Sequence, residues 1–337
     1  GLDTLLLLLL LLLLLLLLRL SSPSLMMHAL SHAILGRRLL AAGLLLTLSI
    51  AEQLPFDLDP RSSSLVVIGA HHFGRDANDP LYDNVKAFSW ASVLLAEASP
   101  PVAAELQKMV LERNPTPHVP PARVHVLGQG VIPGNRTTAA PETLKFYTFD
   151  AQALPGLPFW ATQIGSFNRF HVLKLLPQLA YTRSAARYPP RTLRKHIQAM
   201  DVETKPLAAM LRDAAVDAAG LMIIDTEGLD CAIVASQHWG SASVCRWRPS
   251  VLIFERSHCS SSAYAAARAA LLGAAPCPPR PRRASATTKT KYVAVDERHD
   301  NGNNAAFALM PVAEEKGTWI KGSWLKWLGS ASAESAP

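Results

Sequence analysis

The stretch LMIIDTEGLD, residues 221–230, is the clearest indication of how this chain folds. It opens with four apolar residues, runs straight into Asp225-Thr226-Glu227-Gly228, and continues into helix-like sequence. A short, fully apolar strand of this kind is typical of the centre of a parallel sheet that is covered on both faces. In open α/β sheets, ligands bind beyond the carboxyl ends of such strands. Burying a carboxylate without a partner is costly, so both acids need a role. One alternative is structural: Asp225 caps the following helix, and Glu227 forms a hydrogen bond with a neighbouring loop. The other is that both carboxylates belong to a ligand site.

Three more apolar strands precede this one. They are predicted at residues 65–70 (LVVIGA), 92–98 (SVLLAEA) and 122–132 (ARVHVLGQGVI). The first ends in Gly69, Ala70 and His71, with Gly74 shortly after, and glycines at a strand end let the backbone approach a ligand closely. The second ends in Glu97, the position where an acid commonly binds the hydroxyl pair of a ribose. Gln129 lies between two glycines near the end of the third.

The C-terminal part completes the sheet. SVLIFER, residues 250–256, is a further strand that ends in Glu255, with His258 just beyond. Residues 291–297 and 304–310 are two strands close in sequence, which predicts an antiparallel hairpin. Helices are expected at residues 100–112, 204–214, 229–237 and 261–273, and an extra strand at 144–150. The pattern predicts an α/β fold: a doubly wound, mostly parallel seven-stranded sheet with a C-terminal antiparallel hairpin.

Residues 151–200 form a Pro-rich and aromatic insertion before the central strand. Apolar cover is expected from its aromatic residues Trp160, Phe167 and Phe170. Polar contacts to a ligand are expected from Ser166, Asn168, Arg169 and His171. An insertion of this length is either a substrate lid or a helical cap that shields the sheet.

The charge is concentrated in one place. Of a formal net charge of +7, five positive charges lie between Arg280 and Lys291, in a stretch without an acid. This distribution argues against an extended nucleic-acid-binding face, so no nucleic-acid partner is expected. Residues 276–291 contain too little apolar sequence to pack and are predicted to be a disordered basic loop.

The four cysteines are widely spaced and contain no C-x-x-C pair, so a zinc site is not expected. They are Cys231, Cys245, Cys259 and Cys277. Buried small side chains are the default interpretation, and one disulfide is compatible with an exported domain.

Residues 1–60 are predicted to be a leucine-rich leader outside the folded domain. Leu5 to Leu18 would form a helix about 21 Å long, shorter than a bilayer core of roughly 30 Å. From Met26 onward a basic segment, an apolar run and Ser49-Ile50-Ala51 resemble a signal peptide. The leader therefore predicts entry into the secretory pathway, as a cleaved signal or as an uncleaved membrane anchor, with a cytoplasmic protein as the alternative. Asn135-Arg136-Thr137 is a glycosylation sequon compatible with a lumenal domain.

The order of strands with a terminal hairpin is the plan of the class I S-adenosylmethionine-dependent methyltransferases. More specifically, the chain resembles the FkbM family of methyltransferases. The matching segments are IGAHHFGRDANDP, LLAEASPPVAAELQK, IGSFNRFHVLK, LMIIDTEGLD, SVLIFERSH and DNGNNAAFAL, which cover most of residues 64–312. The most distinctive is Asp225-Thr226-Glu227-Gly228, where the family has a hydrophobic strand that ends in Asp-x-Glu-Gly. The expected domains are thus the leader, a methyltransferase domain over residues 61–312 and a flexible tail over 313–337.

The resemblance implies methyl transfer from S-adenosylmethionine to a sugar or another small hydroxylated acceptor. The cofactor would lie over the turn at Gly69 and Ala70, with Glu97 on its ribose, and Asp225 and Glu227 would line the methyl-transfer cleft rather than bind a metal. The expected cofactor-binding residues are Gly69, Ala70, His71, Gly74, Glu97 and Gln129. Substrate contacts are expected from Ser166 and Arg169, and the base is expected among Asp225, Glu227, Glu255 and His258.

Two other hypotheses stay open. The family's first motif usually reads Asp-x-Gly-Ala-Asn, whereas this chain has Val67-Ile68-Gly69-Ala70-His71, which motivates a methyltransferase fold that binds a glycan or protein without catalysis. A nicotinamide-dependent oxidoreductase is the third hypothesis. The lack of G-x-G-x-x-G and the terminal hairpin argue against it.

Overall fold

The computed structural model describes residues 60–71, 73, 88–113, 118–134, 140–150, 153–154, 157, 161, 164–180, 188–277, 290–299 and 304–311. The predicted leader, the sequon, Gly74, Trp160, the tail and most of the basic loop lie outside these residues. Within the described residues no helix is long and apolar enough to cross a membrane.

The chain alternates strands and helices along its length. The strands are β1 (Ser64–Ile68), β2 (Ser92–Ala96), β3 (Val124–Leu127), β4 (Gly130–Ile132), β5 (Glu142–Phe149), β6 (Gly165–Ser166), β7 (Ile197–Pro206), β8 (Ala219–Ile224), β9 (Val251–Glu255), β10 (Thr290–His299) and β11 (Asn304–Pro311). The helices are α4 (Pro100–Arg113), α6 (Arg169–Lys174), α7 (Leu176–Ala180), α8 (Pro190–Lys195), α9 (Leu207–Asp213), α10 (Asp230–Ser236), α11 (Ala242–Cys245) and α12 (Ser261–Leu272). Two short 3-10 helices are η1 (Pro60–Ser62) and η2 (Pro121–Arg123).

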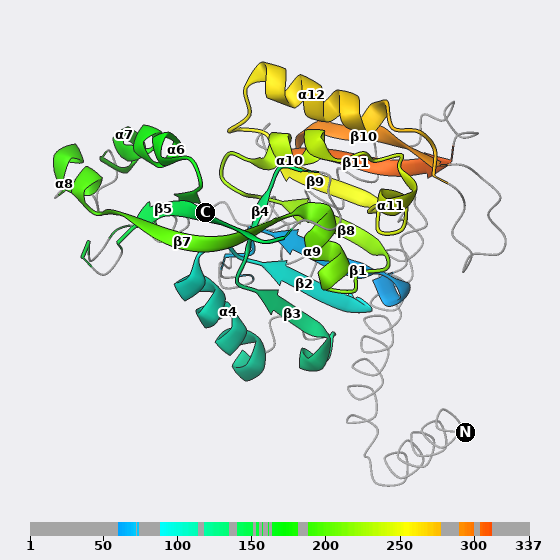
Figure 1. The fold of residues 1–337 in the computed structure, drawn as a ribbon, viewed down its shortest axis with the longest axis horizontal. Helices are drawn as coiled ribbons and strands as arrows, with labels where there is room; N and C mark the ends of the chain where they lie inside the picture. Colours follow the sequence, from blue (N-terminus) through cyan, green and yellow to red (C-terminus); the bar gives the residue numbers. More distant parts are fainter. Residues whose placement is uncertain are drawn as a thin grey trace, which may run out of the picture. The chain divides into compact units, whose positions relative to one another are not determined.

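The larger sheet has the order β10-β11-β9-β8-β1-β2-β3 (Figure 1). Strands β3, β2, β1, β8 and β9 are parallel neighbours, with Ile68 of β1 opposite both Ala96 of β2 and Ile224 of β8. The terminal hairpin adds β11 antiparallel to β9, and β10 antiparallel to β11. The carboxyl ends of β1, β2, β8 and β9 therefore meet at one edge.

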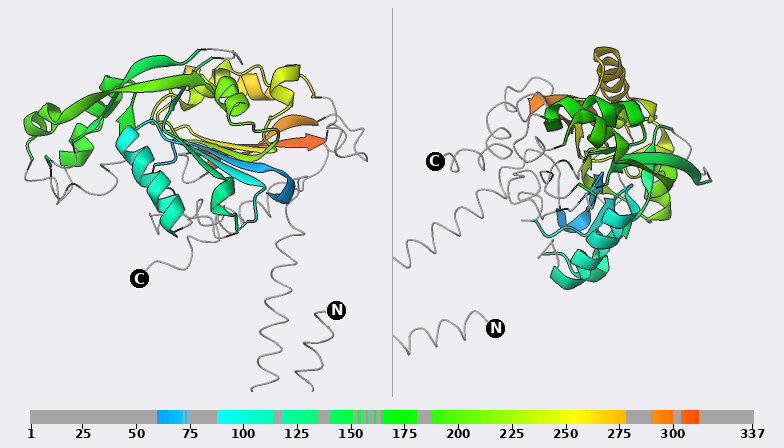
Figure 2. Two further views of the ribbon diagram at one scale, coloured as in Figure 1. Left: turned by 60° about the horizontal axis from the view of Figure 1, so that its bottom comes forward. Right: turned by 90° about the vertical axis from the view of Figure 1, so that its left-hand side faces the viewer.

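Both faces of this sheet are buried, as the apolar strand sequences require. In β8 every residue from Ala219 to Ile224 is buried, and β1 is buried throughout. One face packs in a single core with α9, α10 and α12. Figure 2 shows α4 on the opposite side from these helices, so the sheet is covered by helices on both sides. The α/β class and the mostly parallel sheet are confirmed.

A second sheet, with the order β4-β7-β5-β6, was not predicted. The strand expected at residues 122–132 is in fact two strands, since β3 ends at Leu127 and β4 pairs with β7 instead. The extra strand predicted at 144–150 exists as β5 but belongs to this second sheet. The helix expected from residue 204 begins at Leu207, because residues 197–206 form β7.

The insertion around residues 149–197 has an apolar core of its own. The buried residues are Phe149, Leu154, Ala161, Ile164, Val172, Leu175, Leu176, Leu179 and Leu193, from β5, α6, α7, α8 and the segments between them. Phe167 packs edge-on against Phe146 of β5, with ring centroids 5.1 Å apart, whereas Phe170 is 80% exposed.

The cysteines form two disulfides, where the sequence predicted buried thiols or at most one bridge. Cys231 of α10 pairs with Cys259 after β9, with Cα atoms 6.0 Å apart. Cys245 at the end of α11 pairs with Cys277, with Cα atoms 5.5 Å apart. Spacing along the sequence did not show these pairs, because the partners come together only through the packing of α10 and α11 beside the sheet.

Candidate functional site

The end of β1 lies directly against the end of β8. Gly69 follows β1 with φ +80°, and a Cβ atom at this position would lie 1.6 Å from the carbonyl oxygen of Asp225. The backbone N–H of Asp225 in turn donates to the carbonyl of Ile68 at 2.8 Å. Only glycine fits both the positive φ and this approach, so Gly69 fixes the junction of the two strand ends.

Glu97, at the end of β2, is a buried carboxylate beside the same junction. It is 6% exposed and accepts the backbone N–H of His71 at 2.8 Å and that of Ser99 at 2.7 Å. Burial raises the pKa of Glu97, although these backbone bonds oppose the shift. His71 adopts φ +42°, a conformation that is strained for a residue with a side chain. The predicted cofactor residues Gly69, Ala70, His71 and Glu97 are therefore brought together.

The loop after β8 is shaped by Asp230, the first residue of α10. Its carboxylate oxygens accept the backbone N–H groups of Thr226, at 2.8 Å, and Gly228, at 3.1 Å. Burial raises the pKa of Asp230 to about 6, against the effect of these bonds. The loop also holds Glu227 at φ +53°, which costs roughly 1–2 kcal/mol for a residue with a Cβ atom.

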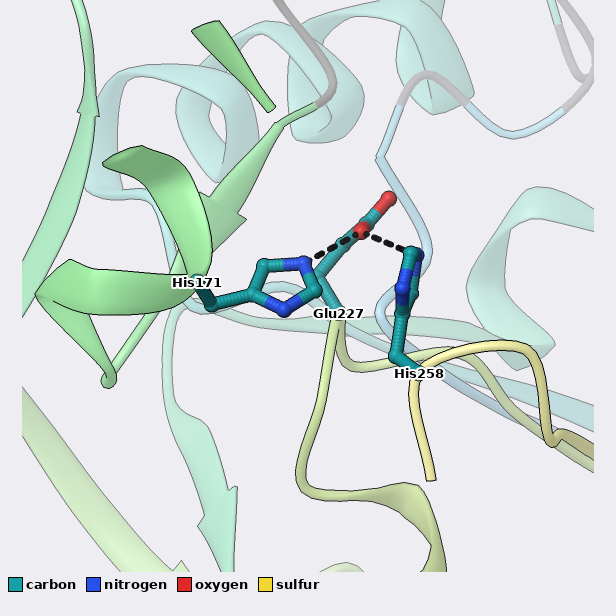
Figure 3. Close-up of side chains that lie close together, drawn as sticks. All are labelled: His171, Glu227 and His258. Carbon is teal, nitrogen blue, oxygen red and sulfur yellow. Dashed lines mark hydrogen bonds and ion pairs between the residues drawn. The ribbon is translucent and has the colours of Figure 1, made fainter. Parts of the chain in front are cut away.

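Glu227 lies between two histidines (Figure 3). Its Oε2 atom is 3.2 Å from Nε2 of His171, on α6, and 3.2 Å from Nε2 of His258, after β9. The two imidazole rings meet edge to face, with centroids 4.4 Å apart. Three segments far apart in sequence thus contribute one side chain each to this triad of His171, Glu227 and His258.

The triad and its neighbour Glu255 are electrostatically linked. Burial disfavours ionised Glu227, but the hydrogen bonds of His171 and His258 prevail and lower its pKa to about 2. The hydrogen bond with Glu227 raises the pKa of His258. Burial and then repulsion from Glu227 raise the pKa of Glu255 to about 7. Glu255 lies close enough to take part, since its Oε1 atom is 3.3 Å from Nε2 of His258.

Local contacts keep His171 and Glu227 in place. Asn168 caps α6 by accepting the backbone N–H of Phe170 at 3.0 Å, which sets the helical turn that carries His171. The Ser166 hydroxyl, fully buried, donates to the carbonyl of Glu227 at 2.9 Å. The substrate residue predicted at 166 therefore holds the loop of Glu227. Gly228 allows the ring of His171 to approach, since a Cβ there would lie 3.2 Å from its Nδ1 atom.

The remaining predicted residues do not join this group. Gln129 donates to Glu203 on the second sheet. Arg169 is exposed at the start of α6, and Gly74 lies outside the described residues. The four predicted catalytic residues Asp225, Glu227, Glu255 and His258 all lie at the ends of β8 and β9.

Two features of the site were not predicted from the sequence. One is the role of Asp230, whose carboxylate closes the loop after β8. An acid two residues after Gly228 is the signal that could have indicated this role. The contact of His171 with Glu227 spans 56 residues, and no spacing rule predicts it.

Comparisons of the chain with protein-family models, with curated proteins and with solved structures give no match.

Proposed function

We propose that this chain is an S-adenosylmethionine-dependent methyltransferase that acts on a hydroxyl group of a sugar or another small acceptor. The observation that carries the proposal is the junction of β1, β2 and β8. There Gly69 forms a tight turn, and the buried carboxylate of Glu97 lies beside that turn. A tight glycine turn with an acid at the next strand end suits a nucleoside ligand, whose ribose hydroxyls donate to the carboxylate.

The strand order supports the same proposal. Five parallel strands are followed by a hairpin whose last strand, β11, is inserted in reverse between β9 and β10. This order agrees with the plan expected of a class I methyltransferase. A dinucleotide-binding sheet would continue with another crossover helix and a parallel strand instead.

The chemistry needs an acceptor oxygen in line with the sulfonium and a base for its proton. The acceptor oxygen attacks the methyl carbon, the carbon–sulfur bond breaks, and its electron pair stays on sulfur to give S-adenosylhomocysteine. We assign the base to Asp225, because its backbone contacts both Ile68 and the Gly69 turn and so lies next to the proposed cofactor site. The triad of His171, Glu227 and His258 then faces the acceptor.

The two disulfides support a location in the secretory pathway. All four cysteines of the chain are paired, and disulfides persist in oxidising compartments. The proposal therefore includes a lumenal or membrane-anchored protein with a small-molecule or glycan acceptor.

A screen for methyl transfer tests the activity. The full chain is incubated with methyl-labelled S-adenosylmethionine and a panel of sugars and other hydroxylated acceptors, and products are identified by mass. Transfer is expected to fall by about 10²–10⁴-fold in Asp225→Asn. Asp217→Asn, which changes an exposed carboxylate paired with Arg246, is the matched control and should retain activity.

Two other outcomes of the screen would contradict parts of the proposal. Full activity of Asp225→Asn would refute the base assignment. No transfer to any acceptor by a protein that binds S-adenosylmethionine would favour the non-catalytic hypothesis, which the altered motif at Val67 and His71 motivates.

A further inference from the structure

The triad of His171, Glu227 and His258 has the composition of a metal site. Two imidazole nitrogens and one carboxylate oxygen are a ligand set of catalytic zinc sites and of facial triads that bind other divalent transition metals. Each ligand comes from a different segment, α6, the β8 loop and the β9 loop, so the set exists only in the folded protein. The sequence predicted no metal, because neither the cysteine spacing nor the carboxylates at 225 and 227 point to these partners.

The two distances to Glu227 fit one shared ion. Bonds of about 2.0–2.2 Å to a metal place neighbouring ligand atoms about 3.0–3.5 Å apart in octahedral or tetrahedral geometry. The two N–O distances to Glu227 are both 3.2 Å, and the three ligand atoms all lie within 4.8 Å of one another. In Figure 3 both ring nitrogens point to the same carboxylate oxygen, one from each side.

Several contacts hold the triad in place. Ser166 fixes the carbonyl of Glu227, and Asp230 closes the loop through two backbone bonds. Next to His258, the disulfide between Cys231 and Cys259 ties the β9 loop to α10. A strained Glu227 held by so many contacts is typical of a functional position.

Glu255 adds a second carboxylate beside the triad. Oε1 of Glu255 lies 3.3 Å from Nε2 of His258. Its Oε2 atom is buried and makes no hydrogen bond within the described part of the chain. A buried carboxylate oxygen without a donor is costly, and a nearby cation would offset this cost.

We propose that His171 Nε2, Glu227 Oε2 and His258 Nε2 bind one divalent transition-metal ion, such as Zn²⁺ or Mn²⁺. Three protein ligands leave coordination positions for water or for an acceptor hydroxyl. An ion there lowers the pKa of the bound hydroxyl and orients its oxygen, whose proton then passes to Asp225. This last role rests on the proposed methyl transfer, whereas binding of the ion does not.

Titration with metal tests the proposal. The full chain, with disulfides intact, is stripped with a chelator and titrated with Zn²⁺ by calorimetry and with Co²⁺ by visible absorption. The expected result is one ion per chain and a Co²⁺ spectrum of mixed nitrogen and oxygen coordination. His171→Ala and His258→Ala should each weaken binding by at least about 100-fold, as the loss of a ligand implies.

His125→Ala is the matched control, because His125 is exposed on β3, away from the triad, and its loss should leave binding unchanged. Thermal unfolding of each metal-free variant verifies that it is folded. Should a variant not fold, the Co²⁺ spectrum of the unmodified protein still decides. A spectrum of the free aqueous ion, no stoichiometric binding, or equal binding by folded His171→Ala and His258→Ala would overturn the proposal.

A parallel titration with S-adenosylmethionine distinguishes failure of the proposed metal site from failure of the proposed methyltransferase activity. Cofactor binding without metal binding would reject only the metal site and leave the triad as a hydrogen-bonded group. Metal binding without cofactor binding would reject the methyltransferase proposal and retain the metal site.

Discussion

Among single residues, Gly69 is the one on which the junction of β1 and β8 depends most. A methyl group at this position would overlap the carbonyl oxygen of Asp225 at 1.6 Å, and φ +80° adds backbone strain. We therefore expect Gly69→Ala to lower the free energy of unfolding by about 3–5 kcal/mol, the range of severe core changes, and to abolish cofactor binding. Urea denaturation and calorimetry measure the two effects.

Gly128→Ala is the control for this change. The nearest atom to a Cβ there is the Cβ of Ala103 at 3.5 Å, an ordinary contact. Its stability should change by less than about 1 kcal/mol, the usual cost or gain of a compatible glycine replacement. Equal stability of the variants at 69 and 128 would contradict the close packing of β1 against β8.

Asp230 predicts a specific dependence of stability on pH. Its pKa is about 6 in the folded protein against 3.8 as the ordinary value, so the folded state binds the proton more tightly than the unfolded state does. The contribution of Asp230 to stability is thus full below pH 4 and is lost as the pH rises to about 6. The decline amounts to about 3 kcal/mol for a shift of this size.

Asp230→Asn should remove this decline. Urea unfolding at several pH values between 4 and 7 gives the difference in stability between the two proteins. That difference should change by about 3 kcal/mol across the window, in the direction that favours the unmodified protein at low pH. A difference that stays constant with pH would show that Asp230 does not titrate in this range.

At the scale of the element, the disulfide between Cys231 and Cys259 has two separable effects. Closing a loop over a separation of 28 residues stabilises the fold by about 3–4 kcal/mol. The same bridge holds the segment after β9, which carries His258. The double change Cys231→Ala with Cys259→Ala should therefore lower both stability and the affinity of the triad for metal.

The second bridge supplies the comparison. Cys245 and Cys277 are separated by 32 residues, so their replacement by alanine should cost a similar free energy. Neither residue adjoins the triad in sequence, and metal affinity should be retained in the folded variant. Equal loss of metal affinity in both double variants would mean that general destabilisation, and not the placement of His258, is the cause.

The elements also show what the sequence could and could not predict. Strands β1, β2, β8 and β9 were predictable because each is a fully apolar run that ends in glycine or an acid. The second sheet was not predictable, since half of the ten residues of β7 are polar and the strand contains neither an apolar run nor a regular alternation over its length. Its pairing with β4 and β5 depends on contacts distant in sequence.

The candidate site likewise contains residues whose positions the sequence predicts and contacts that it does not predict. Glu97, Asp225, Glu227 and Glu255 could be predicted because an acid at a strand end has a fixed place in a parallel sheet. The partnership of His171 with Glu227 could not, because it depends on how the insertion folds over the β8 loop. The cysteine pairs depend likewise on the packing of α10 and α11.

For the protein as a whole, we predict that no cysteine carries a free thiol. All four cysteines are paired, so thiol labelling under denaturing conditions should modify none of them until a reductant is added. The measurement requires protein that has matured in an oxidising compartment. Labelling of two or four cysteines without reductant would contradict the disulfide assignment and weaken the case for the secretory pathway.

The ends of β1 and β2 are the proposed binding site of the cofactor. Calorimetric titration of the full chain with S-adenosylhomocysteine tests it most directly, with Glu97→Gln as the site variant and Glu112→Gln, on the exposed side of α4, as the control. We predict one binding site per chain. The affinity should be at least about tenfold weaker in Glu97→Gln, because a hydrogen bond to a charged group is lost. The affinity of Glu112→Gln should be unchanged. Absence of binding by the folded protein, or equal binding by both variants, would contradict a cofactor site at Glu97.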